Sequence, residues 1–229
     1  MVKFDWSYIA GHIDHTLLKP TATSEDITNL CNEALEMGVH SVCIAPSFVR
    51  LAKSIVGSHL KVVGVISFPL GYSVPEVKVF EVQKCIEQGA DEVDVVMNQG
   101  FVKDKSWNDF DDEISAIVKE ASKHDVLTKI IIEACNLSDQ EKIEVVERLN
   151  VLDADFVKTS TGFSTSGANL DDVILLKKYA KGKLKVKAAG GIRTAKQAID
   201  YLNVGADRIG TSSTRLMREE FSSLLSWTC

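Results

Sequence analysis

Short runs of apolar residues, each about as long as a β-strand, alternate along the chain with longer stretches that have the apolar period of an α-helix. The predicted strands cover residues 13–16, 41–45, 62–67, 92–97, 128–133, 156–159, 185–188 and 208–211. The predicted helices begin near Ser24, Phe48, Val74, Trp107, Ser138, Asn169, Thr194 and Ser213. Several of these starts carry N-cap residues: Thr23 or Ser24, Ser138, and Thr194. The pattern therefore predicts eight strand-then-helix units.

No feature of the sequence marks a boundary between two domains. The chain has four prolines and no Ser- or Pro-rich linker. Its 229 residues fit the length of α/β barrels, which form single domains of roughly 200 to 250 residues. We therefore predict one (β/α)8 TIM barrel over residues 1–229, with residues 1–11 as an N-terminal lead-in.

A short internal repeat refines this prediction. Residues 38–43, 89–94, 153–158 and 205–210 share the pattern of a helix end, a tight turn and entry into a strand, and three of the four copies begin with Gly. They fall on the second, fourth, sixth and eighth predicted strands, and a barrel builds its interior in layers from alternate strands. The aligned columns are therefore candidate layers.

The upper candidate layer contains charged residues. The column reads Cys43, Asp94, Lys158 and Gly210, above a lower one of Ser41, Glu92, Phe156 and Arg208. A single strand lysine is usually an edge or solvent-facing residue, but a lysine and an acid at one depth inside a barrel carry a desolvation cost that a structural core avoids. Glu92 and Arg208, in the lower column, are expected to form a structural ion pair.

Two lysines end neighbouring strands. Lys158 and Lys187 would lie about 4.8 Å apart at the level of the backbone, so we expect their ammonium groups to repel and one amine to have a lowered pKa. A neutral amine attacks carbonyl carbons and forms Schiff bases. Asp94 is then placed to relay a proton through water. The combination predicts carbonyl chemistry.

Glycine-rich loops follow the last strands. Gly190-Gly191 precedes the helix at Thr194, and Gly210 with Ser212 and Ser213 precedes the last helix. Glycines let the backbone approach an anion, and in barrels the loops after strands seven and eight form the usual phosphate site. Thr161-Gly162, after the sixth strand, is a third candidate contributor.

Other candidates are weaker. His12 and His15 flank Asp14, but no further cluster completes a metal site, and we predict none. Asp14 and Thr16, on the first strand, are expected to line the pocket near Lys187. Cys43 is most often an inert residue type, although its column places it beside the amine.

Composition limits the function classes. The chain has 26 Lys and Arg against 32 Asp and Glu, a net charge of −6, which excludes a basic-patch nucleic-acid-binding protein. No apolar stretch is long enough for a membrane span, and the N-terminus has no signal-peptide core. Five cysteines without a C-x-x-C pair fit free thiols. We therefore expect a cytoplasmic protein that acts on small molecules.

Seven stretches, in this order and at these spacings, resemble the deoxyribose-phosphate aldolase family over nearly the whole chain. They are residues 13–20 (IDHTLLKP), 64–71 (GVISFPLG), 92–96 (EVDVV), 129–133 (KIIIE), 155–163 (DFVKTSTGF), 187–193 (KAAGGIR) and 208–213 (RIGTSS). The family comprises class I aldolases with a (β/α)8 barrel. No single stretch would be specific.

The resemblance implies a role for each matching residue. Lys158 is the Schiff-base lysine, Lys187 the lysine that lowers its pKa, and Asp94 the proton-relay acid. The substrate phosphate would be bound around Gly162, Gly190, Gly191, Arg193, Gly210, Ser212 and Ser213. The implied reaction is reversible cleavage of 2-deoxy-D-ribose 5-phosphate to D-glyceraldehyde 3-phosphate and acetaldehyde, without a metal or organic cofactor, in deoxyribose phosphate catabolism.

The C-terminal residues leave the proton donor open. The chain ends at residues 227–229, where some family members have a tyrosine that donates a proton, and water is an alternative donor.

Two other functions are alternatives to the aldolase. A phosphate-binding barrel with isomerase or synthase chemistry explains the glycine loops but gives the two lysines no function. An inactive barrel that binds a phosphorylated metabolite gives no function to the two lysines or to Asp94. From the frequency of such assemblies among soluble enzymes, we expect a homodimer.

Overall fold

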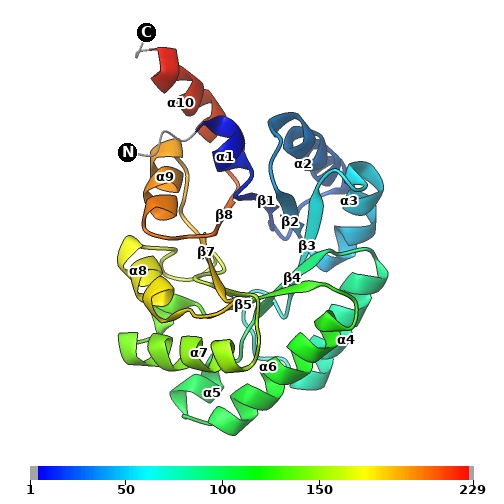
Figure 1. Cartoon of the computed structure of the whole chain (residues 1–229). Helices are drawn as coiled ribbons and strands as arrows, with labels where there is room; N and C mark the ends of the chain where they lie inside the picture. The colour runs from blue at the N-terminus through cyan, green and yellow to red at the C-terminus, as the bar shows by residue number, and fades with distance from the viewer. Residues whose placement is uncertain (1–4, 227–229) are drawn as a thin grey trace.

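The computed structural model describes residues 5–226. Its parallel strands form a closed barrel in which each strand pairs with the next in sequence and the last pairs with the first (Figure 1). The strands are β1 (Ile13–Leu17), β2 (Ser41–Ile44), β3 (Lys61–Ile66), β4 (Glu92–Val96), β5 (Leu127–Ile131), β6 (Phe156–Lys158), β7 (Lys185–Ala189) and β8 (Arg208–Thr211). The prediction of a (β/α)8 barrel is confirmed.

All eight predicted helices are present, and each begins within one residue of its predicted start. They are α2 (Ser24–Met37), α3 (Val49–Val56), α4 (Pro75–Glu87), α6 (Trp107–Ser122), α7 (Asp139–Val151), α8 (Leu170–Tyr179), α9 (Ala195–Asn203) and α10 (Thr214–Ser226). The N-cap predictions are confirmed, because Thr23, Ser138 and Thr194 each form a capping box.

Four short elements were not predicted. They are α1 (Trp6–Ala10), α5 (Gln99–Lys103) and the 3₁₀ turns η1 (Pro46–Phe48) and η2 (Ala134–Asn136). Segments of this length lack two full helical turns, so they show no apolar period. Strands β3 and β5 also end earlier than expected, because Ser67 and Glu133 take left-handed backbone conformations with φ of 50° and 47°.

The internal repeat has a clear structural basis. Its first residue ends a helix with positive φ in every copy, including Asp153 at 59°, where glycine is absent. The third residue of three copies, Asp91, Asp155 and Asp207, accepts a hydrogen bond from the first or second N–H of the preceding strand, each 2.9 Å long. His40 holds this place in the remaining copy. The repeat therefore fixes the N-terminal end of the barrel.

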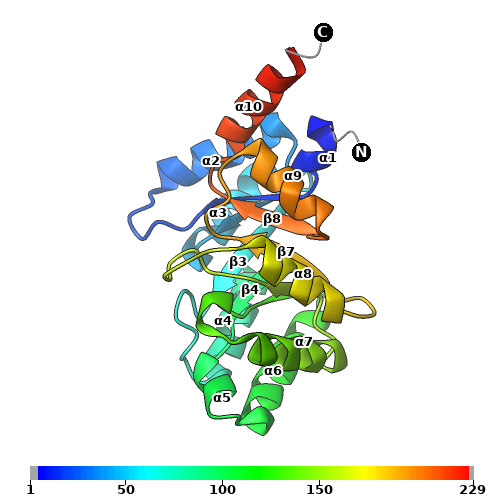
Figure 2. The same ribbon diagram turned by 90° about the vertical axis from the view of Figure 1, so that its left-hand side faces the viewer.

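Helix α1 of the lead-in packs at the same end of the barrel, against α2 and α10. The Trp6 indole donates a hydrogen bond to the carbonyl of Met37, at the end of α2, and its ring lies 6.2 Å from that of Phe221 on α10. Both views show α1 beside α10 (Figures 1 and 2). In the described part of the chain, every helix is too short or too polar to cross a membrane.

The apolar core lies mainly between the strands and the helices that surround them. A small second cluster inside the barrel contains Cys43, Val63 and Val65, from β2 and β3. The rest of the interior is occupied largely by charged side chains.

Candidate active site

The lower interior layer contains the residues expected there, and all four are buried: Ser41, Glu92, Phe156 and Arg208. The Arg208 guanidinium lies 3.4 Å from Glu92 Oε2 and 5.4 Å from the centre of the Phe156 ring. The predicted ion pair between Glu92 and Arg208 is confirmed.

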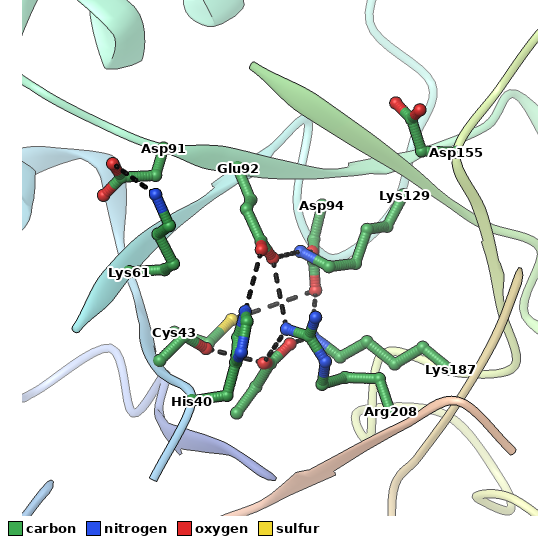
Figure 3. A network of polar contacts seen from close by, with 12 residues as sticks. His40, Cys43, Lys61, Asp91, Glu92, Asp94, Lys129, Asp155, Lys187 and Arg208 are labelled. Atoms are coloured by element: carbon green, nitrogen blue, oxygen red, sulfur yellow. Dashed lines mark hydrogen bonds and ion pairs between the residues drawn. The ribbon is translucent and has the colours of Figure 1, made fainter. Parts of the chain in front are cut away.

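Asp94 lies at the centre of the upper layer, where lysines from three strands converge. Figure 3 labels two of them, Lys129 and Lys187. Asp94 Oδ2 accepts hydrogen bonds from Lys158 Nζ at 2.8 Å and Lys187 Nζ at 2.6 Å, and its Oδ1 accepts one from Lys129 Nζ at 2.9 Å. The barrel register explains the arrangement. Asp94 pairs with Lys129 across β4 and β5, and Lys158 pairs with Lys187 across β6 and β7, so these partners face the same side.

Lys187 is the amine of the pair that keeps its proton. Burial disfavours its ammonium form, but Asp14 and Asp94 together outweigh burial and raise the pKa of Lys187. These two acids lie between the lysines, and the prediction of a lowered pKa for one amine did not include their effect on Lys187. Asp94 is itself held ionised: burial opposes this, but Lys129, Lys158 and Lys187 lower its pKa well below the usual value.

Seven side chains form what we call the interior network: Asp14, Glu92, Asp94, Lys129, Lys158, Lys187 and Arg208. Four are cations and three are carboxylates, so the fully ionised network has one excess positive charge. Three of the cations each contact two carboxylates, whereas Lys158 contacts only Asp94. Lys158 is therefore the cation that loses the fewest ion pairs when it gives up a proton.

Asp14 and Cys43 belong to the interior rather than to the surface of the cavity, and both are fully buried. Asp14 makes a very short contact with Lys187 and accepts hydrogen bonds from Ser41 Oγ at 2.6 Å and Arg208 Nη1 at 2.8 Å. The Cys43 thiol lies 3.9 Å from Asp94, and burial and that carboxylate raise its pKa to about 11. Asp14 thus holds Lys187, and the Cys43 thiol stays protonated at neutral pH.

A cavity opens at the C-terminal end of the strands, directly above Lys158. Nine of the residues predicted for the site border it: Thr16, Lys158, Thr161, Gly162, Gly190, Gly191, Arg193, Gly210 and Ser212. Lys187 and Asp94 lie beneath it, fully buried. Ser213 does not border the cavity, and its N–H donates to Thr211 Oγ1. Lys158 is thus the network member that reaches the cavity.

The loops around this cavity require glycine. Gly162, Gly190 and Gly191 have φ of 85°, 89° and 78°, conformations that other residues rarely adopt. A Cβ on Gly167 would lie 2.1 Å from the Gly190 carbonyl oxygen, so the loop after β6 packs directly on the loop after β7. Gly167 is a residue that the sequence analysis missed.

Three charged residues were also missed. Lys129 contacts both Glu92 and Asp94. Like Lys158, it is a lysine within an apolar strand, so an alignment of the odd-numbered strands would have identified it. Glu133 is buried and accepts hydrogen bonds from the N–H and hydroxyl of Thr161, which fixes the loop after β6. Lys19 borders the cavity from the loop after β1, where no sequence signal marked it.

The fold and the site together define a class: a parallel (β/α)8 barrel with a buried, carboxylate-paired lysine that borders a cavity at the C-terminal ends of its strands. The chain belongs to the DeoC/LacD family of aldolases, whose family model matches residues 9–217.

Curated relatives agree with this assignment. The chain is 49% identical over 208 residues to the deoxyribose-phosphate aldolase of Thermococcus kodakarensis, covering 90% of this chain and 93% of the relative. It is 45% identical over 206 residues to the deoxyribose-phosphate aldolase of Clostridioides difficile, with 90% and 93% coverage.

Solved structures show the same similarity. An aldolase called QR15 superposes with a TM-score of 0.91 at 38% identity, covering 99% of both chains. The deoxyribose phosphate aldolase of Aeropyrum pernix, described as a unique tetramer, superposes with a TM-score of 0.89 at 37% identity, covering 96% of this chain and 93% of that one.

Proposed function

We propose that the protein reversibly cleaves 2-deoxy-D-ribose 5-phosphate to D-glyceraldehyde 3-phosphate and acetaldehyde through a Schiff base on Lys158. The observation that carries the proposal is the position of Lys158, whose amine borders the cavity while a single carboxylate holds it from below. The names of the curated relatives support the choice of substrate.

The ion pairs of the interior network distinguish Lys158 from the other cations. Burial penalises a net charge, and the network has one excess positive charge. Lys187 and Lys129 each contact two carboxylates, which hold them as ammonium groups. Lys158, which contacts one carboxylate and borders the cavity, is the proposed nucleophile.

The chemistry needs an electron sink, which the lysine nitrogen provides. The amine of Lys158 adds to C1 of the open-chain sugar, and loss of water gives a protonated Schiff base. The C3 hydroxyl then loses its proton, the C2–C3 bond breaks, and its electron pair moves toward the nitrogen to leave an enamine. Protonation of the enamine at C2 and addition of water release acetaldehyde. Asp94, in contact with Lys158, is the proposed proton relay.

The substrate phosphate is proposed to bind at the opposite wall of the cavity. Gly190 and Gly191 border the cavity shortly before the start of α9, and Gly210 and Ser212 border it before α10, so their backbone N–H groups are the proposed phosphate donors. Arg193 borders the cavity with an exposed side chain and adds a positive charge. This arrangement sets the aldehyde end of the sugar toward Lys158. Short aldehydes are the proposed partners in the reverse reaction.

Reductive trapping tests the proposal. Acetaldehyde with borohydride should place an ethyl group on Lys158, detected by peptide mapping, and Lys158→Arg should abolish both labelling and cleavage. Lys185→Arg, an exposed lysine at the N-terminal end of β7, is the matched control and should keep both. Labelling of a different lysine, or no labelling, contradicts the assignment.

We also propose a cytoplasmic homodimer. The four described cysteines Cys31, Cys43, Cys85 and Cys135 are free, which supports a reducing compartment. Exposed apolar side chains line the loop before α4 and one face of that helix, and they are Leu70, Tyr72, Val74, Val77 and Phe80. Light scattering should give the mass of two chains, and Phe80→Glu should give monomers. A stable tetramer or monomer of the unaltered protein contradicts the homodimer.

A further inference from the structure

The lower layer of the interior network has no place in the chemistry proposed above. Glu92 and Arg208 do not border the cavity and touch no position available to a substrate. Both are nevertheless buried charges, with side chains 2% and 9% exposed. Apolar residues would fill this depth of a barrel at lower desolvation cost.

A continuous series of ion pairs joins this layer to the nucleophile. Glu92 Oε2 lies 2.5 Å from Lys129 Nζ, Lys129 Nζ lies 2.9 Å from Asp94 Oδ1, and Asp94 Oδ2 lies 2.8 Å from Lys158 Nζ. A second series runs from Arg208 through Asp14 and Lys187 to the same Asp94 oxygen. In Figure 3, Glu92 and Lys129 of the first series and Arg208 and Lys187 of the second lie around Asp94.

We propose that Glu92 and Arg208 are positioning residues of opposite effect, whose charges act through the two series of ion pairs and set the pH dependence of the reaction at Lys158. The proposal rests on the proposed Schiff-base function. With both present, the interior network contains four cations and three carboxylates. Removal of Glu92 leaves two excess positive charges, and removal of Arg208 leaves none.

Glu92 and Arg208 stay ionised over the pH range in which an aldolase is assayed. Burial favours the neutral form of Glu92, but Lys129, a hydrogen bond from His40 and Arg208 lower its pKa to about 2. Burial likewise opposes the Arg208 cation, but Asp14 and Glu92 outweigh it and raise its pKa. Neither residue therefore titrates near neutral pH, so each acts as a fixed charge.

Other charged or titratable groups also face Lys158. From the strands these are Asp14, Cys43, Asp94, Lys129 and Lys187. Lys19 and Arg193 border the cavity above it, and Glu133 contacts Thr161 nearby. At the opposite end, His40 Nε2 lies 3.1 Å from Glu92 Oε1. None of these residues is altered in the variants below, so their contribution is common to all of them.

The sign and size of each effect follow from electrostatics. A unit charge at roughly 10 Å, with an effective dielectric constant of about 20, moves a protonation equilibrium by about one pH unit. Glu92→Gln removes a negative charge that stabilises the Lys158 ammonium, so the acid limb of the activity profile should move about one unit lower. Arg208→Met removes a repelling positive charge, so the limb should move about one unit higher.

The experiment compares the pH profiles of kcat/KM for cleavage and of reductive trapping by acetaldehyde and cyanoborohydride. The double variant Glu92→Gln with Arg208→Met restores one excess positive charge and should return the profile to that of the unaltered enzyme. The charge-conserving variants Glu92→Asp and Arg208→Lys disturb the packing but keep the number of cations and carboxylates in the interior network. Their pH profiles should therefore stay unshifted even where the rate falls. Thermal unfolding identifies any variant that does not fold, and the other neutral single variant, whose shift has a fixed expected sign, then tests the inference.

Each outcome is decisive. Opposite shifts that cancel in the double variant establish the inference. Shifts of the same sign in the two neutral variants overturn the inference. It is also overturned if the profiles do not shift and the neutral and charge-conserving variants lose the same amount of rate; Glu92 and Arg208 are then purely structural. Failure of the proposed function is recognised separately, because the unaltered enzyme would then show no trapping on Lys158 at any pH.

Discussion

Replacing Lys187 by methionine isolates the electrostatic activation of Lys158. Both ammonium nitrogens contact Asp94 Oδ2, at 2.6 and 2.8 Å. At a separation of about 5 Å and an effective dielectric constant of about 20, their repulsion is about 3 kcal/mol, or about two pH units. Lys187→Met leaves three cations and three carboxylates in the interior network. The acid limb of the activity profile should then move about two pH units higher, and cleavage at neutral pH should fall about 100-fold.

The assay is the rate of cleavage across a pH series, with reductive trapping followed in parallel. If Lys187 acts through its charge, both rates should recover at alkaline pH, where Lys158 loses its proton without help. A loss that persists at high pH would refute this reasoning and give Lys187 a direct role in proton transfer. Lys187→Arg, which keeps the charge, should leave the position of the profile unchanged.

Three further predictions concern the loops and the thiols. Arg193→Gln should raise KM for deoxyribose 5-phosphate about tenfold and leave cleavage of unphosphorylated deoxyribose unchanged, because only the former places a dianion beside this side chain. Glu133→Ala should destabilise the protein by about 3 kcal/mol, measured by denaturant unfolding, and raise the same KM, since it leaves the N–H of Thr161 unpaired inside the loop. In iodoacetamide labelling at pH 8, Cys135 should react much faster than Cys43. Burial opposes ionisation of Cys135, but hydrogen bonds, of which the one with Ser164 has the largest effect, lower its pKa, whereas burial raises the pKa of Cys43 to about 11. Equal rates would contradict this.

Much of the fold followed from the sequence because local rules decide it. The alternation of strand and helix periods located every strand of the barrel, and capping residues such as Ser138 located the helix starts. The repeat in residues 89–94 and its copies even predicted which side chains share a layer, because the barrel register follows strand spacing. Local rules misplaced the ends of β3 and β5, where the backbone is left-handed at Ser67 and Glu133. Neither residue type favours a left-handed conformation, so the sequence did not indicate it.

The site was predicted less completely. The sequence indicated Lys158, Lys187 and Asp94 as one cluster, and the structure brings them into contact. The direction in which the pKa of Lys187 is shifted could not be predicted, because a pKa depends on every charge within a few ångströms rather than on one neighbour. Lys129 escaped notice because its strand lies outside the aligned set.

By itself, the sequence determined the class of fold, the presence of amines and an acid inside the barrel, and glycine loops suited to an anion. These depend on periodicity and residue type, which are readable along one dimension. Only the tertiary structure decided which carboxylate each amine contacts, and hence which lysine is spared a second ion pair. The ion pairs depend on distances across the barrel between the carboxylates and the cations. The carboxylates are those of Asp14, Glu92 and Asp94. The balance of charge in this small volume distinguishes the nucleophile from its neighbours.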